Sequence, residues 1–336
     1  MNLRENLLID WVRNACDNPN ATLQAMQNDA SFRHYFRVFS LDNTTFIAMD
    51  APPDKENSKP FVNVAQRLFK AGLNVPEIKA IDWEKGFLLL TDLGNDLYLP
   101  MLKEKEKQND RAEINRLYGD ALAALATMQA CVETDQLPLY DEKLLRFEMS
   151  LLPDWFIAKH LETTLENAEK NQLDSCFDLL VQNALEQPQV FVHRDYHSRN
   201  LLFHPRQNPA ILDFQDAVKG AVTYDLVSLL KDAYISFPRE WIEEKVFGYH
   251  QLSTQMGIIS NVSEKEFLKW FDWMGLQRHI KVAGIFARLN YRDGKAGYLK
   301  DIPLVLKYII ETADLYPEMH GLKELMKRFE NDLKNR

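Results

Sequence analysis

The segment QVFVHRDYHSRNLLFHPRQNPAILDFQD, residues 189–216, decides the fold of this 336-residue chain. Its apolar runs QVFV, LLF and AILDF alternate with a polar loop, HRDYHSRN, and a breaker-rich turn, HPRQNP. This alternation predicts three short strands joined by loops. The polar loop carries Asp195 and Asn200, and the last apolar run carries Asp213 near its end. The segment therefore places polar groups on loops that strands can hold in position.

The spacing of these groups is the catalytic pattern of kinases, His-Arg-Asp-x-x-x-x-Asn, with Asp213 thirteen residues after Asn200. Phosphoryl transfer needs a carboxylate that accepts the proton of the attacking hydroxyl, and Asp195 suits that role. It also needs hard oxygen ligands for Mg²⁺, which Asn200 and Asp213 can supply. The alternative is a chance tripeptide followed by ordinary turn residues. Three groups at matched spacing, each after an apolar run, favour the catalytic interpretation.

The chain resembles the aminoglycoside phosphotransferase-like kinase family. The likeness is carried by VHRDYHSRNLLFHP and by AILDFQDAVKGAVTYDLVSLLKD, which follows it. The segments DASFRHYFRV, MDAPPDKE, GFLLLTDLG and RHIKVAGIFARLNYRDGK extend it over most of the chain. Within the family, the chain looks most like the bacterial anomeric N-acetylmuramate/N-acetylglucosamine kinases of cell-wall recycling. The kinase assignment rests on specific motifs, whereas the sugar assignment rests on the overall likeness.

The resemblance implies an α+β fold of the bilobal protein-kinase-like type, with a small, mainly antiparallel β lobe and a large, mainly α lobe. We expect a nucleotide-binding lobe over residues 1–92 and a catalytic and substrate lobe over residues 93–336. The implied activity uses ATP and Mg²⁺ to convert the anomeric hydroxyl of an amino sugar into a sugar 1-phosphate. The alternatives are a kinase of another small alcohol, of the aminoglycoside or choline type, and a non-catalytic nucleotide-binding scaffold.

Composition narrows the function classes further. Hydrophobic residues make up 46% and charged residues 26% of the chain, as in ordinary globular proteins. The net charge of -9 argues against a general nucleic-acid binder. No apolar run reaches the roughly 18 residues of a membrane span, and the start MNLRENLLIDWV lacks the apolar core of a signal peptide. Three widely spaced cysteines indicate a reducing compartment. We expect a cytoplasmic protein with a small-molecule substrate and no obligatory protein partner.

Two strand-like runs in residues 29–50, separated by Asp42-Asn43, predict the hairpin that covers the phosphates of ATP in kinase-like folds. The phosphate-side loop, residues 30–33, contains no glycine. Backbone amides and polar side chains could contact phosphate in its place. The candidate residues are Ser31, Phe32, Arg33 and Arg37. An ordinary hairpin with surface arginines is the competing interpretation.

The usual phosphate-binding Lys has no counterpart in this sequence. Protein kinases carry a Lys on the third strand that pairs with the phosphates and with a helix Glu. Here the corresponding run ends at Asp50, and the predicted helix 58–71 contains no Glu. Because the resembled sugar kinases share the MDAPP segment, this departure does not by itself indicate an inactive enzyme. Lys55 and Lys59 are candidates for the replacement cation.

A second hairpin is expected at residues 78–83 and 86–91, with its turn at residues 84–86. The residues that follow, Thr91, Asp92 and Leu93, are expected at the hinge where kinase-like folds contact adenine. A plain strand-to-helix turn is the alternative. Apolar positions recurring every three or four residues then predict helices at 114–128, 142–162, 173–186, 302–315 and 318–334. Trp155 could stack on a sugar ring, although such residues more often belong to the core.

Several residues near the catalytic loop have candidate roles. His197 or Arg199 could steady the transferring phosphoryl group, whereas Arg194 is expected to be structural. Asp216 could contact metal-bound water or substrate, or could cap the next turn. The family resemblance implies that Asp225 braces the catalytic loop. The competing interpretation is an acid near the N-terminus of an apolar-striped helix, where the helix dipole favours negative charge, and both can hold at once.

A basic stripe is predicted at residues 278–295. Its members, Arg278, Lys281, Arg288, Arg292 and Lys295, share one face if the helix is continuous. A solvated helix face is one interpretation. The other is a site for an anionic substrate group, in which Arg288 or Arg292 binds the lactyl carboxylate of N-acetylmuramate. The segment Asp293-Gly294-Lys295 could end the helix before the last member.

Overall fold

The computed structural model describes residues 3–26, 32–40 and 44–334. The chain forms two compact units: Met1–Leu97 with Leu201–Asp216, and Tyr98–Asn200 with Ala217–Arg336. The predicted division into functional lobes at residues 92 and 93 stays a prediction. The compact units differ from it chiefly because the chain returns to the first unit after Asn200 and leaves it again after Asp216.

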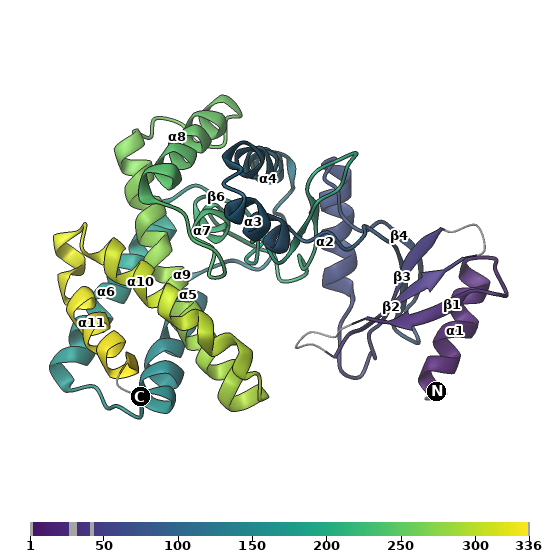
Figure 1. The fold of residues 1–336 in the computed structure, drawn as a ribbon, viewed down its shortest axis with the longest axis horizontal. Coiled ribbons are helices and arrows are strands. Elements are labelled where there is room, and N and C mark those ends of the chain that lie inside the picture. The colour runs from purple at the N-terminus through teal and green to yellow at the C-terminus, as the bar shows by residue number, and fades with distance from the viewer. Residues whose placement is uncertain (1–2, 27–31, 41–43, 335–336) are drawn as a thin grey trace. The chain divides into compact units, whose positions relative to one another are not determined.

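A five-stranded antiparallel sheet organises the first unit (Figure 1). Its order is β1 (Thr22–Ala25), β2 (His34–Phe39), β3 (Thr45–Asp50), β5 (Phe87–Thr91) and β4 (Ile78–Asp82). Strands β2 and β3 pair His34 with Asp50 and Phe39 with Thr45. Both predicted strand runs and the second hairpin are confirmed, whereas the predicted turn at residues 42–43 lies outside the described part of the chain. Strand β1 is an addition, since its sequence TLQA shows no clear apolar alternation.

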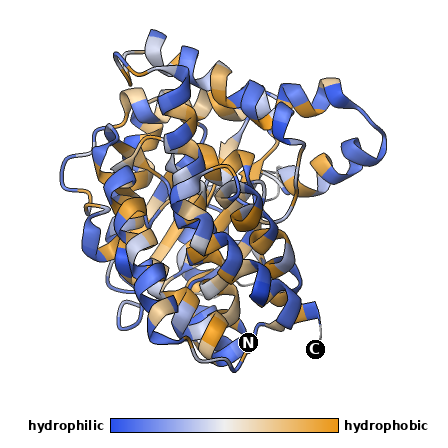
Figure 2. Ribbon diagram, turned by 90° about the vertical axis from the view of Figure 1, so that its left-hand side faces the viewer, coloured by the Kyte–Doolittle hydropathy of each residue, from blue (hydrophilic) through white to orange (hydrophobic). Residues whose placement is uncertain are grey.

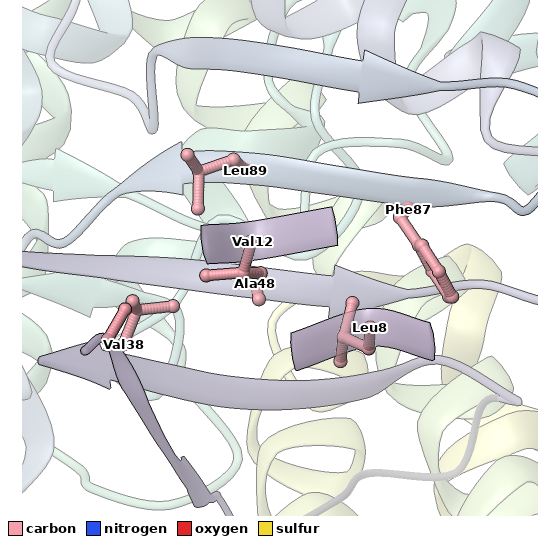
Figure 3. Close-up of a cluster of buried hydrophobic side chains, with 7 residues drawn as sticks. Leu8, Val12, Val38, Ala48, Phe87 and Leu89 are labelled. Atoms are coloured by element: carbon pink, nitrogen blue, oxygen red, sulfur yellow. The ribbon is translucent and has the colours of Figure 1, made fainter. Parts of the chain in front are cut away.

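Helix α1 (Leu3–Ala15) covers one face of this sheet. Figure 3 shows its Leu8 and Val12 packed against side chains from three strands, which are Val38, Ala48, Phe87 and Leu89. The inner positions of α1 are Leu8, Ile9 and Val12, which are buried. Leu3 and Leu7 lie on the exposed edge of the same helix. Burial of the inner side chains stabilises the packing of α1 on the sheet, at about 25 cal/mol per Å² of apolar surface.

The segment 201–216 belongs to the first unit through strand pairing. Strands β7 (Leu201–Leu202) and β8 (Ala210–Ile211) pair with each other, and single bridges join Leu202 to Leu97 and Ala210 to Asn74. Helix α2 (Lys59–Lys70) precedes Asn74 and confirms the predicted helix 58–71. At the β4–β5 turn, Gly86 has φ +72°, and a Cβ there would lie 2.0 Å from the carbonyl oxygen of Ala51. Only glycine fits this approach.

The second unit is mainly helical. It contains α3 (Tyr98–Lys107), α4 (Arg111–Cys131), α5 (Glu142–Leu151), the π-helix η1 (Leu152–His160), α6 (Asn167–Glu186), α7 (Tyr224–Leu230), α8 (Arg239–Gln255), α9 (Glu264–Asp293), the 3₁₀ segments η2 (Ala296–Asp301) and η3 (Pro317–Met319), α10 (Ile302–Ala313) and α11 (His320–Lys334). A small hairpin pairs β6 (Gln189–Val192) with β9 (Val218–Ala221). The predicted helices are confirmed, but the one expected at residues 142–162 is an α-helix only to Leu151 and continues as the π-helix η1. The helix expected at 173–186 begins earlier because Glu166 and Glu169 form a capping box.

Helix α9 is the central element of this unit. It is 30 residues long, and most of its middle is buried. A Cβ on Gly284 would lie 2.3 Å from the carbonyl carbon of Leu151, so α9 and the end of α5 approach at backbone distance. The helix ends at Gly294, which has φ +70° and a left-handed conformation. The predicted segment 278–295 is thus the second half of a longer helix, and Lys295 lies beyond its end.

Several helices, among them α2 and α11, carry hydrophobic and hydrophilic residues on different sides, and Figure 2 shows orange and blue stretches along the ribbons. Such amphipathic helices bury one side and leave the other to solvent. Within the described ranges, no helix combines the length and the apolar character that crossing a membrane requires.

Candidate active site

The predicted catalytic loop, residues 193–200, begins directly after strand β6. The carboxylate of Asp225 accepts hydrogen bonds from the backbone N–H groups of His193 at 2.6 Å and Arg194 at 3.0 Å. Arg194 has φ +77°, a left-handed conformation that is costly for a residue with a Cβ. The two hydrogen bonds hold this conformation in place. The prediction that Asp225 braces the loop is confirmed.

A second buried carboxylate supports the other end of the loop. Asp232 accepts the backbone N–H of Ser198 at 3.0 Å and also binds the Ser198 hydroxyl. Within the loop, the side-chain amide of Asn200 donates to the carbonyl oxygen of Asp195 at 3.0 Å. Sequence reasoning missed Asp232. Asp232 lies just beyond the end of α7 at Leu230, so helical spacing from Asp225 gave no signal for it.

Asp195 is surrounded by positive charge. Burial by itself raises the pKa of Asp195, but Lys281 and then His197, Arg278 and Arg194 lower it to about 2. The carboxylate is therefore ionised at neutral pH and can accept a hydrogen bond from a hydroxyl group. The structure places Asp195 and Asn200 in the same loop of the second unit.

Two members of the predicted basic stripe lie beneath this loop. Arg278 donates to the carbonyl oxygen of Arg194 at 2.9 Å and to the Tyr224 hydroxyl at 3.2 Å. Lys281 donates to the Tyr224 hydroxyl at 2.9 Å, and its ammonium lies 3.2 Å from the Glu148 carboxylate. Arg194 contacts the same Glu148 carboxylate, which agrees with its expected structural role. The interpretation of the stripe as one solvated face is wrong for Arg278 and Lys281, because both are buried between helices.

The remaining members of the stripe differ from one another. Arg292 is exposed and forms an ion pair with Asp293 at 2.9 Å. Arg288 is half-buried, and its Nε has no hydrogen-bond partner in the part of the chain that the structure describes. Burial, and then the charge of Arg292, lower the pKa of Arg288. Trp155 lies in η1 and is half-buried, so it is not part of the fully buried core. Of these two arginines, Arg288 is the one whose charge is less neutralised by a neighbouring acid.

Arg199 and His197 lie next to an aromatic group. The Arg199 guanidinium is 4.7 Å from the ring centroid of Tyr234 and 5.6 Å from that of Tyr298. The His197 ring meets Tyr234 edge-on, with 5.5 Å between centroids. Burial lowers the pKa of His197, although the charges of Asp232 and Asp195 raise it. Arg199 is thus the exposed cation of the loop, and its role toward a phosphoryl group stays a prediction.

The first unit contains two further predicted site residues, Asp213 and Asp216. Asp213 has φ +63°, and its carboxylate accepts the side-chain amide of Gln215 at 2.7 Å. The neighbouring Phe214 ring stacks on Phe61 of α2 at 5.0 Å. This buried ring anchors the exposed Asp213. Asp216 is also exposed and ends the segment that belongs to this unit.

The residues that were predicted to contact the nucleotide differ in their exposure to solvent. Ser31 lies outside the described residues. Phe32 is 59% exposed, whereas Arg33 is buried. Thr91 accepts the backbone N–H of Glu77 through its hydroxyl, and half-buried Leu93 lies two residues further on.

Asp92 and Arg37 form a close ion pair. The Asp92 carboxylate lies 2.7 Å from the Arg37 guanidinium, which also binds Asn95 at 2.7 Å. Arg37 is therefore held by the segment that follows β5.

Comparison with known proteins places the chain in a family. The model of the phosphotransferase enzyme family matches residues 22–258. The chain belongs to this family. An N-acetylmuramate/N-acetylglucosamine kinase of Pseudomonas aeruginosa is 45% identical over 92% of this chain and 88% of that protein. A kinase of the same name from Neisseria meningitidis is 39% identical over 96% of this chain and 95% of that protein.

Solved structures of phosphotransferases share the fold. The choline kinase LicA from Streptococcus pneumoniae superposes with a TM-score of 0.61 at 12% identity, covering 91% of this chain and 99% of that one. An ADP-bound aminoglycoside phosphotransferase gives a TM-score of 0.57 at 15% identity, covering 91% and 98%. The predicted α+β kinase-like fold, with an antiparallel sheet in one part and helices in the other, is confirmed.

Removal of the Asp225 carboxylate should loosen the loop. We expect Asp225→Ala to lower the free energy of unfolding by about 2–3 kcal/mol, because two backbone N–H groups lose their acceptor. Chemical denaturation measures this change. Asp174→Ala, at an exposed position on α6, is the matched control and should change stability by less than about 0.5 kcal/mol. Equal stability of the two variants would contradict the bracing role.

Proposed function

We propose that the protein transfers the γ-phosphoryl group of ATP to the anomeric hydroxyl of N-acetylmuramate or N-acetylglucosamine and releases the sugar 1-phosphate. The observation that carries this proposal is the 45% identity over 92% of the chain to a kinase named for these two sugars. Family membership supports the reaction class, and the braced loop around Asp195 supports its chemistry. We further propose that the reaction takes place in the cytoplasm. Three unpaired cysteines support a reducing compartment.

In the proposed reaction, Asp195 orients the sugar hydroxyl and accepts its proton. An anomeric hydroxyl is more acidic than an ordinary alcohol, so a carboxylate with a low pKa can serve as a late proton acceptor. Lys281 and Arg278 keep this carboxylate ionised from beneath the loop. We propose Arg199, with His197 beside it, as the loop's contribution to steadying the transferring phosphoryl group.

We propose Asn200 and Asp213 as ligands of Mg²⁺. Both supply oxygen atoms, the donors that Mg²⁺ prefers. In the described parts of the chain, no group of three or more His, Cys, Asp or Glu side chains could hold a metal by itself. This fits a cation that takes its remaining ligands from nucleotide phosphates and water, as Mg²⁺ commonly does. When bound, the ion would neutralise charge on those phosphates.

We propose that adenine meets the backbone of Thr91, Asp92 and Leu93. The hydrogen bonds of Thr91 to Glu77 and of Asp92 to Arg37 fix this segment at the end of β5. Ser31, Phe32 and Arg33 are proposed on the phosphate side. Asp216 and Trp155 are proposed near the sugar. Trp155 is half-buried, as a ring with one stacking face available should be.

The sugar carboxylate is proposed to bind on α9. Lys281 and Arg288 are two helical turns apart, about 10 Å along the axis, and so lie on one side of the helix. Arg288 is the less compensated cation, because Arg292 already pairs with Asp293. We therefore assign the lactyl carboxylate of N-acetylmuramate to Arg288 first and to Arg292 second.

A panel assay tests the function. Consumption of ATP and formation of a sugar phosphate are measured with N-acetylmuramate, N-acetylglucosamine, choline and an aminoglycoside. We expect turnover of the two amino sugars. Phosphorus NMR should show that the phosphate is attached at the anomeric position. Turnover of choline or the aminoglycoside alone would replace the proposed substrate. Nucleotide binding without turnover of any of them would favour the scaffold alternative.

Arg288→Ala should change kcat/KM differently for the two sugars. Loss of a charge-assisted hydrogen bond is worth about 10- to 100-fold in affinity, so kcat/KM for N-acetylmuramate should fall by that factor. The value for N-acetylglucosamine, which lacks the carboxylate, should change less than threefold. Arg292→Ala should have a smaller effect, and Arg116→Ala on α4, an exposed arginine paired with two acids, is the neutral control. Equal losses for both sugars would remove the carboxylate assignment.

A further inference from the structure

The third strand of this protein carries an acid with its own structural partner. Asp50 ends β3, where kinases place the phosphate-binding Lys. Its carboxylate accepts hydrogen bonds from Arg4 of α1, at 2.6, 2.9 and 3.0 Å, and it is 5% exposed. Asp50 therefore fastens α1 to the sheet. Helix α2 contains no glutamate, so the usual Lys–Glu pair cannot form at these positions.

An Arg–Glu pair lies nearby in the same unit. The guanidinium of Arg33, the residue directly before β2, lies 3.5 Å from the carboxylate of Glu56, which comes shortly before α2. Glu56 also accepts the backbone N–H of Phe32 at 3.3 Å. The ring of Phe61 lies 6.0 Å from the Arg33 guanidinium. Arg33 is only 8% exposed, so its position is held by neighbours from β2, α2 and the loop between β3 and α2.

This pair lies close to Asp213. Phe61, the ring beneath Arg33, stacks on Phe214, the residue that follows Asp213. The charges of Arg33, Glu56 and Asp213 all act on the phenol of Tyr35, which lies on β2. Burial raises the pKa of Tyr35, Arg33 lowers it, and Asp213 and Glu56 raise it. One phenol is thus within electrostatic range of the Arg33 guanidinium and of both carboxylates.

We infer that the Arg33–Glu56 pair replaces the missing Lys–Glu pair. Arg33 binds the phosphates of the nucleotide, and Glu56 is the positioning residue that holds the guanidinium. The inference rests on the proposed use of ATP. A guanidinium suits the role because it can bind phosphate oxygens in a bidentate manner while remaining bonded to a carboxylate. Its proximity to Asp213, a proposed metal ligand, puts the cation near the phosphates that the metal would also contact.

The other candidate cations, Arg37, Lys55 and Lys59, fit the role less well. Arg37 binds Asp92 and Asn95. Lys55 is exposed and lies 5.5 Å from the ring of Phe32. Lys59 begins α2 and is exposed. The structure thus favours Arg33 over the lysines that the sequence suggested.

Calorimetric binding of ATP, ADP and adenosine to the full chain tests this inference. We expect Arg33→Ala to weaken ATP and ADP binding by about 10- to 100-fold and adenosine binding by less than twofold. Arg33→Lys should restore part of the loss because it keeps the charge. Glu56→Gln should weaken ATP binding several-fold and leave adenosine unchanged. Arg67→Ala, at an arginine on α2 whose guanidinium donates to Asn63, is the matched control and should bind all three ligands normally.

Two outcomes would overturn the inference. One is unchanged ATP affinity in Arg33→Ala. The other is an equal loss for ATP and adenosine, which would indicate damage to the fold. Since Arg33→Lys preserves most of the side chain's volume, it gives a second comparison if the alanine variant is unstable. The readout is separate from the proposed function, because failure to phosphorylate any amino sugar would leave these binding ratios measurable.

Discussion

Replacement of Asp195 by asparagine is expected to reduce kcat for amino-sugar phosphorylation by about 10²- to 10⁴-fold, the usual contribution of a general base. Asparagine keeps the size of the side chain and can still hold a hydroxyl, but it cannot take the proton. The bracing hydrogen bonds of the loop run to Asp225 and Asp232, so its backbone should keep its conformation. Nucleotide affinity should therefore change by less than about threefold.

Steady-state kinetics and calorimetry on the same preparation check this result. Asp174→Asn on α6 removes an exposed carboxylate of the second unit and serves as the control for net charge. Its kcat should equal that of the wild type. Retention of more than a tenth of the wild-type kcat in Asp195→Asn would show that another group accepts the proton. A parallel loss of nucleotide binding would show instead that the substitution disturbs the structure.

Removal of the Lys281 charge should have the second large effect. Lys281→Met leaves the buried Glu148 with one of its two ion-pair partners. Breaking a buried ion pair in this way typically costs about 3–5 kcal/mol of stability. Burial lowers the pKa of Lys281, but Glu148 and Tyr224 raise it, and the net shift is upward. The contribution of Lys281 is thus fully present below its ordinary pKa and is lost only as the pH rises through the raised value. The loss in Lys281→Met should therefore be visible throughout the neutral range.

The pH dependence of activity should change in the same variant. In the wild type, burial raises the pKa of Asp195 but Lys281 and its neighbours lower it to about 2. Protonation of Asp195 thus does not limit the wild-type enzyme in an ordinary assay. Without the Lys281 charge this pKa rises, and lower pH begins to protonate the base. The ratio of variant to wild-type kcat/KM should fall as the pH is lowered from about 7.5 to about 5.

Two further variants sharpen this test. Lys281→Arg keeps the charge and should retain the wild-type pH profile. Lys265→Met removes an exposed lysine from the same helix and should alter neither stability nor the profile. If the activity ratio of Lys281→Met did not depend on pH, the electrostatic role of Lys281 would be wrong, whatever the loss of stability.

The sequence by itself determined the local elements and the reaction class. Strands and helices followed from apolar periodicity because that signal comes from neighbouring residues. The pattern around Asp195 and Asn200 indicated phosphoryl transfer because these residue types and their spacing meet a specific chemical need. The bracing role of Asp225 came from the family resemblance, and the hydrogen bonds to His193 and Arg194 confirm it.

Only the tertiary structure decided which charges face inward. Helical spacing placed Arg278 and Lys281 on one side of a helix, but it could not show that this side packs beneath the catalytic loop. The sequence also could not predict which residues pair with Asp50 and Arg33. Arg4 lies 46 residues from Asp50 in the chain, and nothing in the local sequence links Arg33 to Glu56. Burial and pairing depend on contacts between distant segments. They therefore arise only when the whole chain has folded, whereas periodicity is already present in each segment.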